Sequence, residues 1–192
     1  MNVPRFAPLS AALLMLGLTS CPETNVPRDF GVKPAVLKPE AWEGDWSEVE
    51  NPEEKVHFAI KQADQGVLSI TLHDKEKKTD SVIEAVVRHA SEDKGSQLLF
   101  LVWFDKPGTT LGPLSLMSKH ADNVFYLWHP RHEVIEKAIA SGRLKGTVTK
   151  SKDGAHSELV PEASNYSLLT LPEFWDWTAP DAYFKHASPK AK

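Results

Sequence analysis

Residues 56–72 of this chain read VHFAIKQADQGVLSITL, and they contain two segments in which apolar side chains alternate with polar or small ones. The first segment is 56–60 and the second is 68–72. A period of two places every second side chain on the same face of a β-strand. Gly66 provides a turn residue between the segments, so the stretch predicts two antiparallel strands joined by a turn.

Strand patterns recur along most of the remaining chain. Residues 124–128 alternate in the same way, whereas 98–104 form an unbroken apolar run, typical of a strand covered on both faces. Further strand candidates are 42–50, 81–89, 111–117 and 144–149. Segment 81–89 would also suit a short helix, but its valines and isoleucine favour a strand. Strands spaced about ten to fourteen residues apart predict a mainly β fold, an antiparallel meander forming a barrel or a strongly curled sheet of about seven to eight strands.

One helix is expected between the strands. Pro130 precedes it, and the apolar residues of 134–139 fall on one stripe with the helical period. Gly142 offers a cap at the carboxyl end, so the pattern predicts a helix near 131–141. A second short helix is expected over 162–169, near the C-terminus.

The N-terminus has the pattern of an export signal. Arg5 precedes an apolar run, 11–18, which is too short to cross a bilayer as a helix. The run ends in Leu18-Thr19-Ser20-Cys21, which resembles the lipobox of bacterial lipoproteins, where small residues precede an invariable cysteine. The resemblance implies that 1–20 are a lipoprotein signal peptide. It also implies that the Cys21 thiol takes a diacylglycerol group and that the new amino group takes an acyl chain such as palmitate.

The alternative is an ordinary secretory signal with an incidental cysteine. Cys21 is the only cysteine of the chain and stands at the expected place, which favours the lipoprotein interpretation. Acyl chains contribute about 0.8 kcal/mol for each buried methylene, so two or more would hold the protein on a membrane almost permanently. In well-studied Gram-negative lipoproteins an aspartate after the cysteine favours the inner membrane. Here that residue is Pro22, so we expect a lipid-anchored protein of the outer membrane that faces the periplasm.

The pattern divides the chain after the signal peptide into three parts. Residues 21–40 contain four prolines and little periodicity, which predicts an extended, poorly packed tether. Residues 41–186 are expected to form a single β-rich domain. The polar residues 187–192 predict a disordered tail.

Composition limits the classes of function. The chain has 192 residues, 41% of them hydrophobic, and a formal net charge of −4. This composition is typical of a globular protein and excludes wholesale disorder, collagen and coiled coil. Because the chain is mildly acidic and has no basic run, a nucleic-acid partner is not expected.

The start of the expected domain contains a short family-like element. Gly44-x-Trp46 on a first strand resembles the G-x-W element of lipocalins and related calycins, in which the tryptophan plugs one end of an eight-stranded barrel. In those families an arginine late in the barrel packs across the indole, and Arg143 and Arg131 are the late candidates. Large aromatic side chains more often belong simply to the core. Four tryptophans are therefore expected to be structural or to line a ligand cavity: Trp42, Trp46, Trp103 and Trp128.

Other clusters offer little chemistry. The densest titratable cluster, residues 129–133, contains two histidines and a glutamate, but it is better explained as the exposed start of a helix than as a zinc site. No serine elbow or phosphate loop is present, and the only thiol belongs to the anchor. We therefore expect no catalytic residue, no metal and no cofactor. The apolar segment 174–177 is expected to fold back as a lid on the core rather than to form a surface patch.

These observations predict a membrane-anchored envelope lipoprotein that is not an enzyme. Its β-rich module would bind a small apolar ligand or an envelope component. A structural or assembly lipoprotein acting through protein contacts, and an envelope hydrolase with a cryptic site, stay open as alternatives. The predicted partners are the membrane, through Cys21, and an apolar small molecule or an envelope protein.

Overall fold

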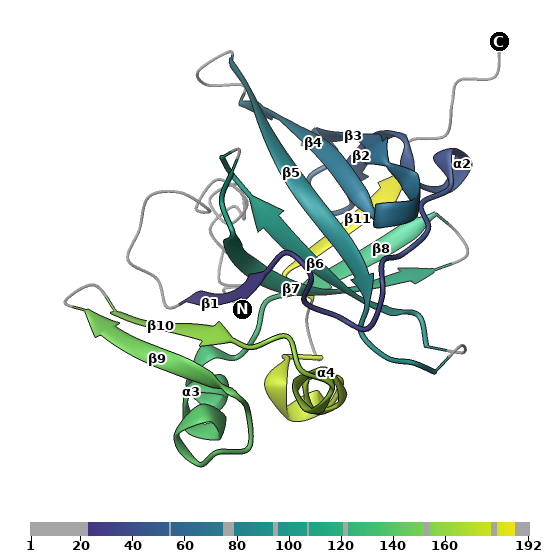
Figure 1. Cartoon of the computed structure of the whole chain (residues 1–192). Helices are drawn as coiled ribbons and strands as arrows, with labels where there is room; N and C mark the ends of the chain where they lie inside the picture. Colours follow the sequence, from purple (N-terminus) through teal and green to yellow (C-terminus); the bar gives the residue numbers. More distant parts are fainter. Residues whose placement is uncertain are drawn as a thin grey trace, which may run out of the picture.

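The computed structural model describes most of the chain that follows the N-terminal segment, as Figure 1 shows. The described residues are 23–53, 55–74, 79–93, 96–106, 108–120, 123–151, 154–177 and 180–186. Cys21, the signal peptide 1–20 and the tail 187–192 lie outside the described residues, so these three assignments stay predictions.

Eight strands form a closed antiparallel barrel. Around the barrel they follow in the order β2 (Gly44–Glu48), β3 (Lys55–Gln62), β4 (Val67–Asp74), β5 (Thr79–His89), β6 (Leu98–Phe104), β7 (Leu111–His120), β8 (Val124–Trp128) and β11 (Ala182–His186). The ring closes because β11 pairs with both β8 and β2. The predicted fold class, a mainly β antiparallel barrel, is confirmed, and segment 81–89 is a strand rather than a helix.

Three more strands extend the sheet outside the barrel. β1 (Glu23–Pro27) pairs antiparallel with the start of β7, while β10 (Gly154–Leu159) pairs parallel with β1 and antiparallel with β9 (Gly146–Ser151). At Gly112, β7 passes so close to β6 that a Cβ would lie 2.0 Å from the Trp103 carbonyl oxygen. Glycine is therefore required where β7 leaves β6 and turns to β1.

Short helices connect the strands: α2 (Pro39–Trp42), the 3₁₀ turns η1 (Ala63–Gln65) and η2 (Pro172–Phe174), α3 (His132–Ala140) and α4 (Ala163–Leu169). The helices predicted near 131–141 and 162–169 are confirmed as α3 and α4. The strand predicted from Trp42 begins two residues later, because Pro39 starts a helical turn that includes Trp42. Every helix within the described ranges is too short or too polar to span a membrane.

Apolar side chains form two cores, one inside the barrel and one on its outer face. The unbroken apolar run of β6 belongs to both. Leu99, Leu101 and Trp103 point into the barrel, while alternate residues such as Phe100 and Phe104 point outward. The outer core is covered by α3, α4, η2 and β1. Of these elements, α3 and α4 lie below the barrel in Figure 1.

The segment predicted to be a tether is folded over most of its length. Residues 23–37 belong to the folded part of the chain: β1 pairs with two strands, and Phe30, Ala35 and Leu37 are buried. Proline did not prevent this, because Pro27 is the last residue of β1, and after it the N–H groups of Val32 and Ala35 still donate to the carbonyl oxygens of His89 and Val87 on β5. The spacer prediction is therefore wrong for 23–37, and the folded part begins 18 residues before the predicted boundary at 41.

A candidate binding site at the mouth of the barrel

One end of the barrel is closed by tryptophans. Trp46 on β2 is fully buried, and its indole N–H donates a hydrogen bond to the carbonyl oxygen of Trp42 at 3.0 Å. Gly44 has a φ of 116°, a backbone conformation that favours glycine, and the His186 ring lies beside it. Gly44-x-Trp46 therefore lies at one end of the barrel, on its first strand.

The cation that covers these indoles is not the predicted arginine. The ammonium group of Lys119 on β7 lies 5.7 Å from the Trp46 ring centroid and 5.9 Å from that of Trp42, within the range of cation–π attraction. Burial lowers the pKa of Lys119 from its ordinary value. Arg143 lies elsewhere, on the outer core, where it pairs with the Glu173 carboxylate at 2.6 Å.

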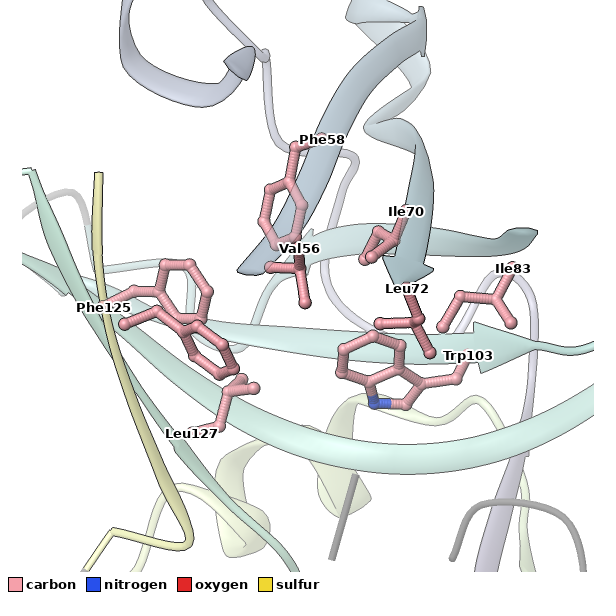
Figure 2. A pocket seen from close by; sticks show the side chains of 9 residues that line it. Val56, Phe58, Ile70, Leu72, Ile83, Trp103, Phe125 and Leu127 are labelled. Atoms are coloured by element: carbon pink, nitrogen blue, oxygen red, sulfur yellow. The ribbon is translucent and has the colours of Figure 1, made fainter. Parts of the chain in front are cut away.

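A small cavity lies inside the barrel, away from the tryptophan-closed end. Nine side chains line it, and all of them are apolar: Val56, Phe58, Ile70, Leu72, Ile83, Trp103, Phe125, Leu127 and Phe184. They come from β3, β4, β5, β6, β8 and β11 and point toward the barrel interior, as Figure 2 shows for eight of them. The cavity volume is about 10 Å³, which is the minimum for one water molecule. The barrel interior is therefore almost filled by its own side chains.

Aromatic rings form the floor of the cavity. Phe58 and Phe125 stack with centroids 5.6 Å apart, and both contact the Trp46 ring, at 5.7 and 4.8 Å. Phe184 stacks on the other side of Phe125 at 5.0 Å. This column of rings joins the closed end to the cavity, so only the opposite end is free to admit a ligand.

Trp103 forms part of the cavity wall without exposing its polar atom. Its indole N–H donates to the Ser115 hydroxyl at 3.0 Å, inside the barrel wall. A buried indole needs such a partner. Because the Ser115 hydroxyl on β7 accepts the hydrogen bond of the indole N–H, the apolar ring surface of Trp103 is the part that lines the cavity.

The rim of the cavity adjoins a groove on the outer surface. Leu72 and Ile83 are only partly buried, unlike the rings on the floor. The groove has a volume of about 270 Å³ and is lined by Glu23, Asn25, Ile83, Trp103, Asp105, Leu111 and Pro113. Ile83 and Trp103 line both spaces, so the groove and the cavity meet at these two side chains. We call this end, with Leu72, Ile83 and Trp103 at its rim, the mouth of the barrel.

The remaining predicted aromatic positions lie outside the barrel. Trp128 belongs to the outer core and packs against Trp177 with centroids 5.0 Å apart. Phe174 and Trp175 are completely buried in the same core, so segment 174–177 folds back on the protein as expected. Of the four predicted tryptophans, only Trp103 lines the cavity; Trp42 and Trp46 close the opposite end.

Histidines gather where β1 meets α3. His132 Nδ1 lies 3.0 Å from the hydroxyl oxygen of Thr24, and the His129 backbone N–H donates to the Asp181 carboxylate at 2.5 Å. The pKa of His132 is lowered to about 4, chiefly by burial and then by the nearby His129 and His156, against the opposing effect of the Asp181 carboxylate. Among the residues that the structure describes, no three histidine, cysteine, aspartate or glutamate side chains form a group able to hold a metal ion. Thr24 is buried, so its hydroxyl is not open to a substrate.

Comparison of the chain with protein-family models, with curated proteins and with solved structures finds no match in any of the three. The chemistry of the site is therefore inferred from its geometry alone. An apolar lining without a charged group offers dispersion contacts and exclusion of water, and it provides no acid, base or nucleophile.

Proposed function

We propose that this protein is an envelope lipoprotein, anchored to a membrane through lipid on Cys21, whose barrel binds an acyl chain at its mouth. The observation that supports the binding role is the cavity whose nine lining side chains are all apolar, in a barrel closed at the other end by Trp42 and Trp46. A polar ligand would lose its hydrogen bonds to water there without replacing them.

The size of the cavity selects the shape of the ligand. A space of about 10 Å³ leaves no room for a bulky ring, so a ligand has to bind in the mouth, where Leu72 and Ile83 are only partly buried. Leu72 and Ile83, at the partly buried rim, change rotamer at lower cost than the stacked phenylalanines on the floor. A thin, flexible aliphatic chain is the apolar group that needs the least opening, and each methylene that it buries contributes about 0.8 kcal/mol.

Displacement of a fluorescent fatty acid from the purified protein tests the binding role. Leu72→Trp should fill the mouth and weaken binding at least tenfold, whereas Ile83→Ala should widen it and strengthen binding. Val82→Ala is the matched control, because Val82 is 61% exposed on the adjacent position of the same strand. Equal affinity of the wild type and the three variants for the fatty acid, with unchanged melting temperatures, would show that the fatty acid does not bind at the mouth.

The anchor is tested separately. Cys21→Ser should abolish incorporation of labelled palmitate and leave a larger, unprocessed precursor, because the lipobox resemblance makes the thiol the attachment point. Equal incorporation in wild type and variant would rule out lipid attachment at Cys21.

A second function, assembly through protein contacts, is favoured by a different observation. Within the described part of the chain, β9 ends the strand order and pairs only with β10, so its other edge is open to an extended segment of an envelope protein. Thr147 and Thr149 are exposed on this strand. Replacing both with lysine should remove cross-linked partners from whole cells without changing the melting temperature. An unchanged cross-linking pattern would exclude β9 as the contact.

A further inference from the structure

The groove at the mouth includes the first described residue of the chain. Glu23 lines it together with Asp105, Ile83 and Trp103. Glu23 is held there by the sheet, because β1 pairs with β10 on one side and β7 on the other. The place where the chain enters the fold is therefore fixed beside the mouth.

The short distance from Glu23 to Cys21 places the predicted anchor at the same point. Two residues of chain span about 7 Å when fully extended, and less in any other conformation. The segment that follows, 23–37, cannot lengthen this connection, because it is packed into the fold. Lipid on Cys21 would thus hold the groove against the bilayer surface.

The closed end is far from this point. β4 has eight residues and runs along the barrel wall, and a strand rises about 3.3 Å per residue. Allowing for the usual tilt of strands in a barrel, the two ends are about 20 Å apart. α2 lies at the closed end, on the opposite side of the barrel from β1 in Figure 1.

The charge of the groove indicates which lipid can approach. Glu23 and Asp105 provide two carboxylates, and the adjoining groove, which shares Ile83 and Asp105 with this one, adds the cations Arg28, Lys61 and Lys106. The carboxylates attract the ammonium group of a zwitterionic headgroup, while the cations nearby attract its phosphate.

From these observations we infer that the mouth of the barrel faces the membrane and takes an acyl chain of a zwitterionic phospholipid directly from the bilayer. The inference depends on the proposed anchor at Cys21 and adds to it an orientation and a lipid class. The ammonium group would lie between the carboxylates of the groove, while one acyl chain lies against Ile83 and Trp103 at the mouth.

Single introduced cysteines test the orientation in the full-length, membrane-extracted protein. A polarity-sensitive fluorophore is attached at Asp105→Cys, in the groove, or at Glu40→Cys, an exposed position of α2 at the closed end. The protein is reconstituted in vesicles that contain a lipid with a quencher in its headgroup region. We expect strong quenching at 105 and less than one third as much at 40. Equal quenching at both sites, or stronger quenching at 40, would overturn the orientation.

Labelling stoichiometry distinguishes a failed orientation from a failed anchor. Cys21 is the only natural cysteine, so a lipid-modified protein takes one fluorophore per chain and an unmodified protein takes two. Two fluorophores and no vesicle binding would refute the anchor, and with it the inference. One fluorophore with quenching only at 40 would refute the inference and leave the anchor intact.

Lipid uptake tests the second half of the inference. The protein is incubated with vesicles of phosphatidylethanolamine or of phosphatidylglycerol. It is then released from its anchor by cleavage at an introduced protease site and separated from the vesicles in detergent-free buffer. Mass spectrometry identifies the lipid that the released protein retains. We expect phosphatidylethanolamine to be retained several-fold more than phosphatidylglycerol, and Glu23→Gln with Asp105→Asn to remove the preference. A preference for phosphatidylglycerol, or no retained lipid, would contradict the assignment.

Discussion

Replacement of Trp46 by alanine should be among the most destabilising changes in this protein. The Trp46 side chain is fully buried, and it contacts Phe58, Phe125 and the His186 ring at centroid distances of 5.7, 4.8 and 4.8 Å. Truncation of a buried tryptophan costs about 3–5 kcal/mol, because the lost burial adds to the cavity left behind. The hydrogen bond to the Trp42 carbonyl is lost as well, which adds about 1 kcal/mol.

A loss of about 4–6 kcal/mol should lower the melting temperature by roughly 10–20 °C in a chain of this size. Circular dichroism is the appropriate measurement, because removal of a tryptophan alters the fluorescence signal itself. Trp46→Phe, which keeps most of the volume, should cost about 2 kcal/mol. Trp177→Ala is the matched control, since Trp177 is only partly buried and packs against one ring. If Trp46→Ala cost less than Trp177→Ala, the closed end would not be a core of the fold.

Two further predictions concern stability. The free energy of unfolding should fall by about 2 kcal/mol as the pH is lowered from 6.5 to 4. The reason is that the pKa of His132, about 4 in the folded protein, lies below its value in the unfolded chain, so the unfolded chain takes up the proton first. His132→Asn keeps an acceptor for the Thr24 hydroxyl and should make the free energy of unfolding, measured by urea denaturation, depend less on pH. An equally steep pH dependence in the variant would show that other groups cause it. Gly112→Ala should cost more than about 2 kcal/mol, because the new Cβ would overlap the Trp103 carbonyl oxygen. Gly142→Ala, whose Cβ would meet nothing within 4 Å, should cost about 1 kcal/mol, and equal costs would argue against the close crossing.

The barrel could be predicted from the sequence because most of its strands show their own periodicity. β3, β4 and β8 alternate cleanly, and the continuous apolar run of β6 correctly indicated two covered faces. β11 was missed, because its five residues have a weak pattern and are strand only through pairing with β2 and β8. Such pairing joins the two ends of the barrel and is not visible in any local window.

β1 was missed for a different reason. Prolines at 22 and 27 made the segment resemble a spacer, although Val26 is completely buried and Thr24 nearly so. The alternation of Thr24 and Val26 with polar neighbours was the available signal, but it covers too few residues to outweigh the prolines.

The site was predicted only in part. A tryptophan-rich barrel interior was expected, but sequence alone could not separate Trp103, on the cavity wall, from Trp128, on the outer core. The two tryptophans lie on strands whose residues face both cores, so their side is set by register rather than by composition. The groove could not be predicted either, because its lining residues come from β1, β5, the end of β6 and the start of β7.

Quenching of tryptophan fluorescence by a fatty acid brominated in the middle of its chain tests the binding site most directly. Bromine quenches an indole only at close range, and Trp103 is the one tryptophan among the nine residues that line the cavity. We expect saturable quenching of the wild-type protein that is largely lost in Trp103→Phe and retained in the outer-core variant Trp128→Phe. Quenching that is unchanged in Trp103→Phe, or lost in Trp128→Phe, would place the acyl chain outside the barrel and contradict the account.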